Sequence, residues 1–274
     1  MQGVPELFAD SRDRAVFRHL PQLPGVELYQ AHINQHSFEP HTHEAFGIGG
    51  IISGAETFRY RGASHTAGAG SLVMMNPDEL HTGHAASEHG WSYRMIYLDG
   101  DLLSQLTGRS NIAFDEVMRF DPASATKIIQ SIGALWQSHS LLEQQGLLYT
   151  LAEDLQPILR HRVKPDAPVR FTQVRDYLHA NYMHSVDLQT LAELVGLSRW
   201  HFLRQFQAHF HASPHQMLMA IRLWHAKRLL TTGMPAAQVA AASGLTDQAH
   251  LTRSFQRRYG TTPARYQKQV QTAI

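Results

Sequence analysis

Two stretches in the last third of the chain decide the fold: residues 196–214, GLSRWHFLRQFQAHFHASP, and residues 244–263, GLTDQAHLTRSFQRRYGTTP. They repeat one pattern, in which a short apolar segment and a Gly-Leu turn lead into a longer amphipathic segment. In both copies the last inward phenylalanine precedes a proline by eight residues. Each copy therefore predicts a short helix, a glycine turn, and a longer helix that begins at a Ser or Thr cap.

This repeat is the arrangement of a helix-turn-helix, present twice. The second helix of such a unit fits the major groove, which is about 12 Å wide and presents a distinct edge for each base pair. The predicted helices cover residues 170–182, 188–195, 198–210, 214–230, 236–242 and 246–259. We therefore expect an all-α DNA-binding domain over residues 170–274.

The two longer helices of the repeat leave polar side chains free to face DNA. Phe202 and Phe206 point inward in the first copy, as Leu251 and Phe255 do in the second. Arginine can bind guanine O6 and N7 with two hydrogen bonds. The alternative is a small helical bundle whose arginines are only solvated. The candidate DNA contacts are Ser198, Arg199, Trp200, His201, Arg204 and Gln205 in the first copy, and Gln248, Ala249, Thr252 and Arg253 in the second.

The charge distribution favours DNA as the partner of this domain alone. The net charge of +1 conceals a split: residues 1–168 carry 12 Lys and Arg against 19 Asp and Glu, whereas residues 169–274 carry 12 against 4. A basic domain attached to an acidic one indicates that only the basic part meets a polyanion, although a solvated basic face would have the same composition.

Composition excludes several other classes of protein. Hydrophobic residues at 43% and charged residues at 17% are typical of a globular chain. Because the chain has no cysteine, a disulfide framework, a thiolate zinc site and a cysteine nucleophile are excluded. The first residues lack the apolar region of a secretory signal, and no apolar run approaches the ~20 residues of a bilayer span. We expect a cytoplasmic protein without a membrane partner.

The first hundred residues predict β-structure. Short apolar or alternating runs cover residues 26–33, 46–52, 57–60, 71–75 and 92–98. Turn signals separate them, including Ser53-Gly54 between the second and third runs. Several short strands at this spacing predict a sandwich or small barrel over residues 1–100.

A helical section is expected over residues 101–163. Asp121 is a candidate N-cap, followed by Pro122 at the first helical position. Seven leucines form a stripe from Leu141 to Leu159, more than one helix hairpin can hide, so they are expected to bury against the β domain or a second subunit. We expect this section to form a homodimer interface. Residues 164–169, KPDAPV, break the helical pattern where the charge changes sign and predict the linker.

Residues 170–267 resemble the C-terminal domain of the AraC/XylS family of bacterial transcription regulators. The resemblance implies two helix-turn-helix units, joined by the helix at 214–230, that read successive major grooves about 34 Å apart. His211 stands where a glycine matching Gly260 is expected, a small departure because imidazole tolerates left-handed φ. The resemblance is carried by Leu191, Ala192, Gly196, Leu197, Ser198, Phe202, Phe206, Pro214, Arg222, residues 226–230, Gly244, Asp247, His250, Arg253, Phe255, Gly260, Pro263 and Tyr266.

The N-terminal half resembles a cupin, the small β barrel that many of these regulators use to bind an effector. The first motif is PHTH at residues 40–43, followed by Gly54, and the second is GSLVMMNP at residues 70–77, followed by His81. The resemblance implies that His41, His43 and His81 converge in the effector pocket, and we expect His41 and His43, two residues apart on one strand, to point to the same face. Phe46, Tyr60, Tyr93 and Met95 are expected to supply the apolar wall, and Glu44 or Arg94 a charged anchor at the mouth.

The same resemblance raises the question of a metal. In metal cupins two histidines, a glutamate and a later histidine converge, and imidazole suits zinc, iron or copper. His41, His43 and His81 match the histidines, but Gly47 and Ile48 occupy the positions where the glutamate is expected. A metal-free pocket is therefore favoured over a metal site and over histidines with a structural role only.

We therefore expect an α+β protein of two domains, in which a cupin-like β barrel and a helical dimerisation section precede the two helix-turn-helix units. The resemblance implies an effector-responsive transcription regulator, most often an activator. Its expected partners are double-stranded DNA, a small-molecule effector, a second copy of the chain and RNA polymerase. The alternative is a cupin metalloenzyme fused to a DNA-binding domain, which is disfavoured because no complete metal set, carboxylate pair or nucleophile stands out. We expect no catalytic residue, no cofactor and no bound metal.

Overall fold

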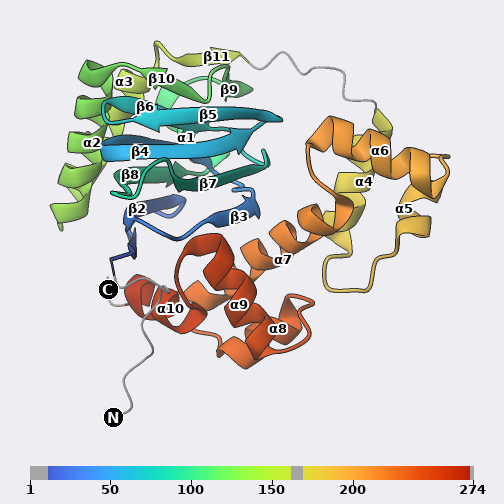
Figure 1. Cartoon of the computed structure of the whole chain (residues 1–274). Helices are drawn as coiled ribbons and strands as arrows, with labels where there is room; N and C mark the ends of the chain where they lie inside the picture. Colours follow the sequence, from blue (N-terminus) through green and yellow to red (C-terminus); the bar gives the residue numbers. More distant parts are fainter. Residues whose placement is uncertain (1–11, 162–168, 272–274) are drawn as a thin grey trace.

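The chain folds into a sheet-rich N-terminal domain and an all-helical C-terminal domain, which confirms the predicted α+β class (Figure 1). The computed structural model describes residues 12–161 and 169–271. The predicted linker, residues 164–169, lies outside these ranges except for Val169, the first residue of a helix. Within the described ranges, no helix has the length and hydrophobicity of a membrane-spanning segment.

The N-terminal domain is built on a sheet of nine antiparallel strands. Its main path runs β1-β2-β8-β4-β6-β10, while β3 pairs with β7, and β5 and β7 pair with β4. All five predicted runs lie in strands, two of them in β4. The strands are β1 (Arg14–His19), β2 (Val26–Ile33), β3 (Phe38–His41), β4 (Phe46–Tyr60), β5 (Ala63–Gly68), β6 (Ser71–Met75), β7 (His81–Ala85), β8 (Trp91–Leu98) and β10 (Met118–Phe120).

The turn predicted at Ser53-Gly54 is wrong, because β4 continues through it as a bulge. The register against β8 shifts between Ile51 and Ser53. Gly54 has φ +71°, and a Cβ there would lie 2.0 Å from the carbonyl oxygen of Gly90. Only glycine accommodates both the conformation and the close approach, so the strand bends without ending. Its first part pairs with β6 and β8, and its second part with β5 and β7.

The sheet wraps around an interior but does not close, so the prediction of a barrel is wrong in this respect. Among the described residues, no pairing joins β1 to β10, the two ends of the main path. The C-terminal domain covers the β1 edge instead: helix α10 (Pro263–Gln271) packs on it, and the amide N–H of Phe17 donates to Gln269 Oε1 at 3.1 Å. A covered edge does not require a further strand to satisfy its backbone groups.

The section predicted as helical contains strands as well. It comprises α1 (Gly100–Thr107), β9 (Ile112–Phe114), β10, α2 (Pro122–Gln137), α3 (Leu141–Leu155) and β11 (Leu159–His161). Asp121 caps α2 as predicted, accepting from the amide of Ser124 at 3.1 Å. The strands were missed because each has only three residues, too few to show a period.

The leucine stripe of α3 divides between the core and the surface. Leu148, Leu151 and Leu155 are buried in the core that α1, α2 and α3 share with the outer face of the sheet. Leu142 is 80% exposed on the opposite side of α3. The stripe was expected to be buried against the β domain or a second subunit, and the β domain buries most of its leucines.

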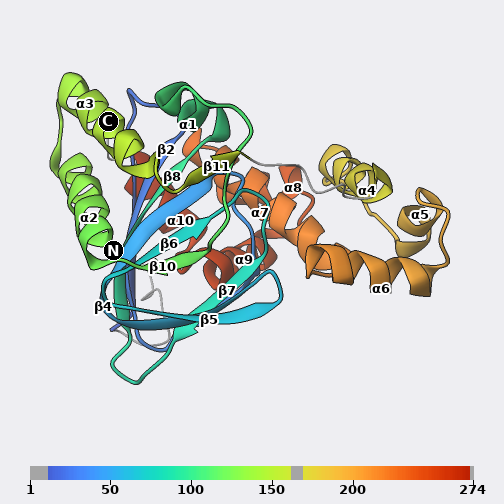
Figure 2. The same cartoon turned by 90° about the horizontal axis from the view of Figure 1, so that it is seen from above.

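The C-terminal domain contains the two predicted helix-turn-helix units, α5–α6 and α8–α9, joined by α7. Figure 2 shows the first unit standing away from the sheet and the second packed against it. Ser198 caps α6, and a capping box formed by Ser213 and Gln216 begins α7. His211 adopts φ +53° after α6, as expected for the position of the missing glycine. The helices are α4 (Val169–Ala180), α5 (Leu188–Glu193), α6 (Arg199–Phe210), α7 (Pro214–Thr231), α8 (Ala236–Ala242), α9 (Gln248–Tyr259) and α10.

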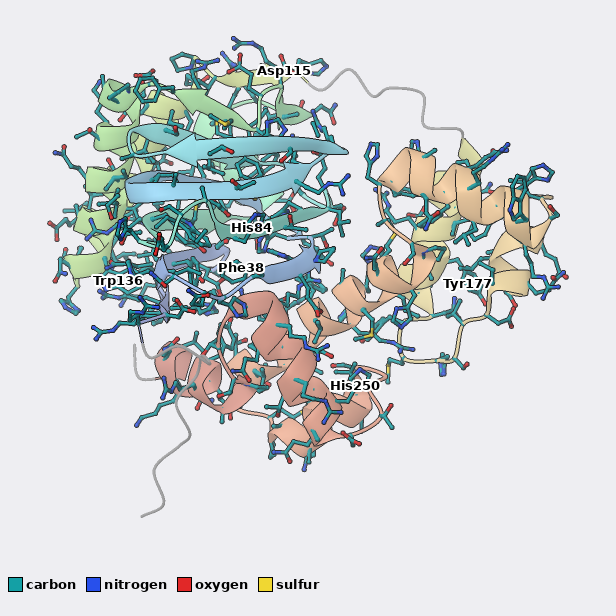
Figure 3. All side chains as sticks on the ribbon, viewed as in Figure 1. Phe38, His84, Asp115, Trp136, Tyr177 and His250 are labelled. Carbon is teal, nitrogen blue, oxygen red and sulfur yellow. The ribbon has the colours of Figure 1, made fainter. Side chains whose placement is uncertain are left out.

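The two units belong to different cores. The first has its own, which includes Phe171, Phe202 and Phe206. The second shares a continuous core with the inner face of the sheet, where Tyr266 of α10 packs edge-on against Phe17 of β1 at 5.3 Å. Figure 3 shows the same contrast: Phe38 lies in the part of the sheet nearest the second unit, whereas Tyr177 lies on α4, beside the first unit and apart from the sheet.

Candidate functional site

The first reading helix, α6, presents a basic and aromatic face to solvent. Arg199, Trp200, His201 and Arg204 lie on this face, together with the less exposed Gln205. Trp200 is 64% exposed, and the guanidinium of Arg204 lies over its ring at 4.6 Å. An Arg–Trp pair on the surface can meet both a phosphate and a sugar or base face. The Ser198 hydroxyl accepts from the amide of His201 at 3.4 Å, so its first role is to cap the helix.

The cap of the second reading helix, α9, lies one residue later than predicted. It is Asp247, not Thr246, and the Asp247 carboxylate accepts from the amide of His250 at 2.6 Å. The helix still exposes Gln248, Ala249 and Arg253, while Thr252 is half-buried and donates to the carbonyl of Gln248 at 2.9 Å. All ten predicted DNA contacts therefore lie on the two reading helices or their caps.

A cavity of about 40 Å³ lies inside the sheet, where the second unit packs on it. Five predicted effector residues line it: His41, His43, His81, Tyr93 and Met95. His43 lies beyond the end of β3, not on the same strand as His41, yet its ring still meets those of His41 and His81 at 5.1 and 5.0 Å. The remaining lining residues are Phe17, Tyr29, Phe38, Glu56, Val73, Met75, Thr82, Gly83, Tyr97, Arg258 and Tyr259.

Three predicted effector residues do not line this cavity. Phe46 faces the other side of the sheet and packs edge-on against Phe114 at 5.7 Å, because alternate residues of a strand point to opposite faces. Tyr60 borders a neighbouring cleft of about 320 Å³ between the sheet and the α6–α7 junction. Glu44 lies outside both, and burial together with the charge of Asp78 raises its pKa to about 8.

The three histidines form a compact, neutral cluster. One ring nitrogen from each lies within 4.8 Å of the others. His41 Nδ1 lies 2.7 Å from the carbonyl of Glu39, and His81 Nδ1 lies 3.0 Å from that of Glu79. These contacts assign the proton to Nδ1, which donates, and leave Nε2 of both rings with a free lone pair. Burial lowers the pKa of all three imidazoles, that of His81 to about 4.

The cluster meets some requirements of a metal site and fails others. Neutral imidazoles whose second nitrogen donates to a carbonyl are the usual ligands of zinc. However, no carboxylate joins the three histidines in the part of the chain that the structure describes. The positive charge of Arg258 also lowers the pKa of all three imidazoles, and the same repulsion opposes a metal cation. The residues therefore do not fit the metal set of a cupin.

Sequence reasoning missed most of the cavity wall. Tyr97 shares the alternation of Tyr93 and Met95 along β8, so the period of that strand could have found it. Phe17 and Phe38 come from short strands without a clear pattern. The largest omission has no local signal: Arg258 and Tyr259 belong to α9, the second reading helix, and reach the cavity because the C-terminal domain packs on the sheet.

Comparison with known proteins supports both the ligand-binding domain and the helix-turn-helix domain. An AraC-like ligand binding domain matches residues 23–156, and a helix-turn-helix domain matches residues 191–269. The uncharacterized HTH-type transcriptional regulator YbfI of Bacillus subtilis is 26% identical over 82% of this chain and 86% of its own length. The lactose operon transcription activator of Staphylococcus xylosus is 24% identical over 79% of this chain and 81% of its own.

Solved structures of ToxT from Vibrio cholerae have the same fold. An apo form of a ToxT variant superimposes with a TM-score of 0.60 at 10% identity, covering 90% of this chain and 98% of ToxT. A form with bound unsaturated fatty acid gives 0.54 at 12% identity, covering 90% and 95%. The two domain families match in the expected order, and the relatives that match over most of their length are transcriptional regulators. The solved structures share the two-domain fold. The chain belongs to the AraC/XylS family of transcription regulators, which bind DNA through a helix-turn-helix domain and carry a ligand-binding domain before it.

Proposed function

We propose that this regulator is an effector-responsive activator whose sensor cavity binds a small organic molecule without a metal. The observation that carries the proposal is the shared cavity wall, because Arg258 and Tyr259 of the second reading helix line the same space as the sensor histidines. A ligand that contacts both domains changes the free energy of their packing, and its differential affinity for the two arrangements shifts the population. The lactose operon relative, an activator, supports activation over repression.

The size of the cavity limits the effector. About 40 Å³ accommodates only a few water-sized groups, whereas one ToxT structure holds an unsaturated fatty acid. The wall combines aromatic rings with a few polar groups, as small-molecule sites do. We infer a compact effector, smaller than a lipid.

We propose that DNA is bound by the ten residues named on α6, α9 and their caps, with Arg204 and Arg253 reading bases. Both side chains lie on the outer face of their helix: Arg204 precedes the inward Phe206 by two residues, and Arg253 precedes the inward Phe255 by two. The domain order proposed is a sensor over residues 1–100, a dimerisation section over 101–163, a linker over 164–169 and the DNA-binding domain over 170–274. We propose a cytoplasmic location and contact with RNA polymerase, in keeping with activation.

We propose that the protein acts as a homodimer through the outer face of α3. Leu142 and Tyr149 are exposed and two helical turns apart, so they form one apolar stripe on a helix whose other face is buried. A second copy can bury the same stripe around a two-fold axis.

We propose that the protein is not an enzyme. The relatives are regulators, and the described histidine cluster lacks the carboxylate that a metalloenzyme of this type would use. Sites should first be selected from random DNA with the full chain, and affinity for those sites should then be measured with and without a metabolite panel. A metabolite that changes DNA affinity and is recovered unaltered supports the proposal. Steady consumption of a bound metabolite would instead support the metalloenzyme.

A further inference from the structure

Lys227, Arg257 and Arg258 of the C-terminal domain contact the sensor, and the first two have a counter-ion among the described residues. Lys227 pairs with Glu27, and Arg257 lies 3.5 Å from Glu39. Arg258 is 4% exposed, and no described carboxylate lies within ion-pair distance of it.

The contacts of Arg258 leave part of its guanidinium unsatisfied. One terminal nitrogen donates to the carbonyl of Thr42 and lies 3.5 Å from its hydroxyl. The guanidinium carbon lies 5.2 Å from the centre of the Tyr259 ring. The Nε atom is buried without a hydrogen-bond partner among the described residues. A buried charge that lacks both a counter-ion and one of its hydrogen bonds costs free energy, which an anion would offset.

No neighbouring acid in the described ranges supplies that anion at neutral pH. The charges of Arg228 and Arg258 lower the pKa of Glu44, but burial and the charge of Asp78 outweigh them and raise it to about 8, so its carboxyl is mostly protonated near pH 7. Glu56 lines the cavity, and burial raises its pKa to about 8 as well. The cavity therefore holds a permanent positive charge without a permanent negative one.

We propose that the effector is a small organic carboxylate and that its carboxylate binds Arg258 inside the cavity. Guanidinium matches a carboxylate in geometry as well as in charge. His43 lines the same cavity and carries one N–H in either tautomer, so it can donate to the second carboxylate oxygen. The aromatic rings of Tyr93 and Tyr97 surround the remaining carbon skeleton.

This anchor makes the second reading helix part of the effector site, a consequence that rests on the proposed function. Arg258 lies five residues after Arg253 on α9. A ligand bound to Arg258 therefore acts on the same helix that presents Arg253 to DNA. No relay between domains is needed, because the effector touches the reading helix itself.

The test uses the full chain and matched pairs of acids and amides: acetate with acetamide, propionate with propionamide, and lactate with lactamide. Binding is measured by ligand-detected NMR and calorimetry, first without DNA. The variants are Arg258→Gln, Arg258→Lys and, as the matched control, Arg257→Gln, which removes the neighbouring exposed charge. Thermal unfolding of each variant establishes that it folds.

At least one acid should bind the wild type more tightly than its amide. Its affinity should fall at least about tenfold in Arg258→Gln, partly recover in Arg258→Lys and stay unchanged in Arg257→Gln. The proposal is overturned if no acid is preferred to its amide at millimolar concentration, or if Arg258→Gln binds the acid as the wild type does. DNA affinity with and without the acid is then measured separately. A carboxylate that binds through Arg258 without changing DNA affinity would leave this inference standing and reject the proposed regulation.

Discussion

Lys227 of α7 and Glu27 of β2 form an ion pair across the two domains, and each side chain is only 13% exposed. The Tyr266 hydroxyl donates to the same carboxylate at 2.9 Å, and His19 Nε2 lies 2.7 Å from it. The Lys227 ammonium also lies 4.6 to 5.8 Å from the ring centres of Phe17, Tyr97, Tyr259 and Tyr266. Three of these rings, Phe17, Tyr97 and Tyr259, also line the sensor cavity. The domain contact and the ligand site are therefore one packed unit.

Breaking this pair from one side should loosen the domain contact. Glu27→Gln leaves the Lys227 charge buried without its counter-ion, so we expect a loss of about 3–5 kcal/mol in the free energy of unfolding or of domain packing. Lys227→Met on its own should cost less, because Met fills the aromatic surroundings and Glu27 keeps two hydrogen-bond partners. The double variant should recover part of the loss of Glu27→Gln. Denaturant unfolding and small-angle scattering measure the two quantities, and additive effects in the double-mutant cycle would contradict the assigned coupling.

Acid should weaken the same contact. Burial alone would raise the pKa of Glu27, but the charges and hydrogen bonds of Lys227 and His19 lower it from 4.5 to about 2. Because the packed state holds the carboxylate with a lowered pKa, this stabilisation is complete above about pH 4.5 and disappears as the pH falls towards 2. Unfolding measured across this range should show a dependence on pH that is smaller in Glu27→Gln. An identical dependence in both proteins would show that Glu27 is not its source.

Replacing either proposed base-reading arginine should relax sequence preference in one half of the DNA site. Arg204→Ala or Arg253→Ala should cost about 1–3 kcal/mol on the selected site and broaden base choice under that helix only. Arg175→Ala, on α4 outside both reading helices, is the control. Binding to randomised sites provides the measurement, and unchanged preference in both variants would reject the assignment.

The dimer should depend on the exposed leucine of α3. Leu142→Asp places a charge in the proposed interface without touching the core, so the dimer should dissociate at least about tenfold more readily. Thr126→Asp adds the same charge to an exposed position of α2 and should have no effect. Sedimentation equilibrium measures the association. A wild-type monomer at tens of micromolar, with and without DNA, would exclude this interface.

The histidine cluster should bind the effector and not a metal. His41→Ala and His81→Ala should abolish the response to effector while leaving affinity for DNA intact, since both residues lie in the cavity and far along the chain from the reading faces. Protein purified without tags or chelators should contain well under one equivalent of zinc or iron. If the wild type instead contains close to one equivalent of zinc or iron and His43→Ala does not, the histidine cluster is a metal site.

Interactions between residues close together in the sequence account for the parts of the fold that could be predicted. The helix-turn-helix units depend on glycine turns, caps and a 3.6-residue period, all of which operate within about ten residues of each other. The boundaries of α6 and α8, the cap at Asp121 and the left-handed His211 follow from such short-range rules. The five apolar runs of the sensor could likewise be predicted as strands, because their patterns also lie within a few neighbouring residues.

Contacts between distant residues decided the rest. Whether Gly54 turns the chain or bulges it depends on the carbonyl of Gly90 across the sheet. Whether Phe46 faces the cavity depends on the strand's register against its neighbours, and a shift of one residue would reverse its side.

The sequence by itself determined the family, the two reading helices and the three histidines that meet in the sensor, because motif spacing and local periodicity carry that information. Only the tertiary structure decided that the barrel stays open under α10, that most of the leucine stripe belongs to the sensor core, and that Arg258 enters the cavity. Arg258 and Thr42 are 216 residues apart, and their contact exists only because the second helix-turn-helix unit packs on the inner face of the sheet. Burial of that shared apolar surface is non-directional and brings together residues far apart in the chain, so no local sequence pattern predicts it.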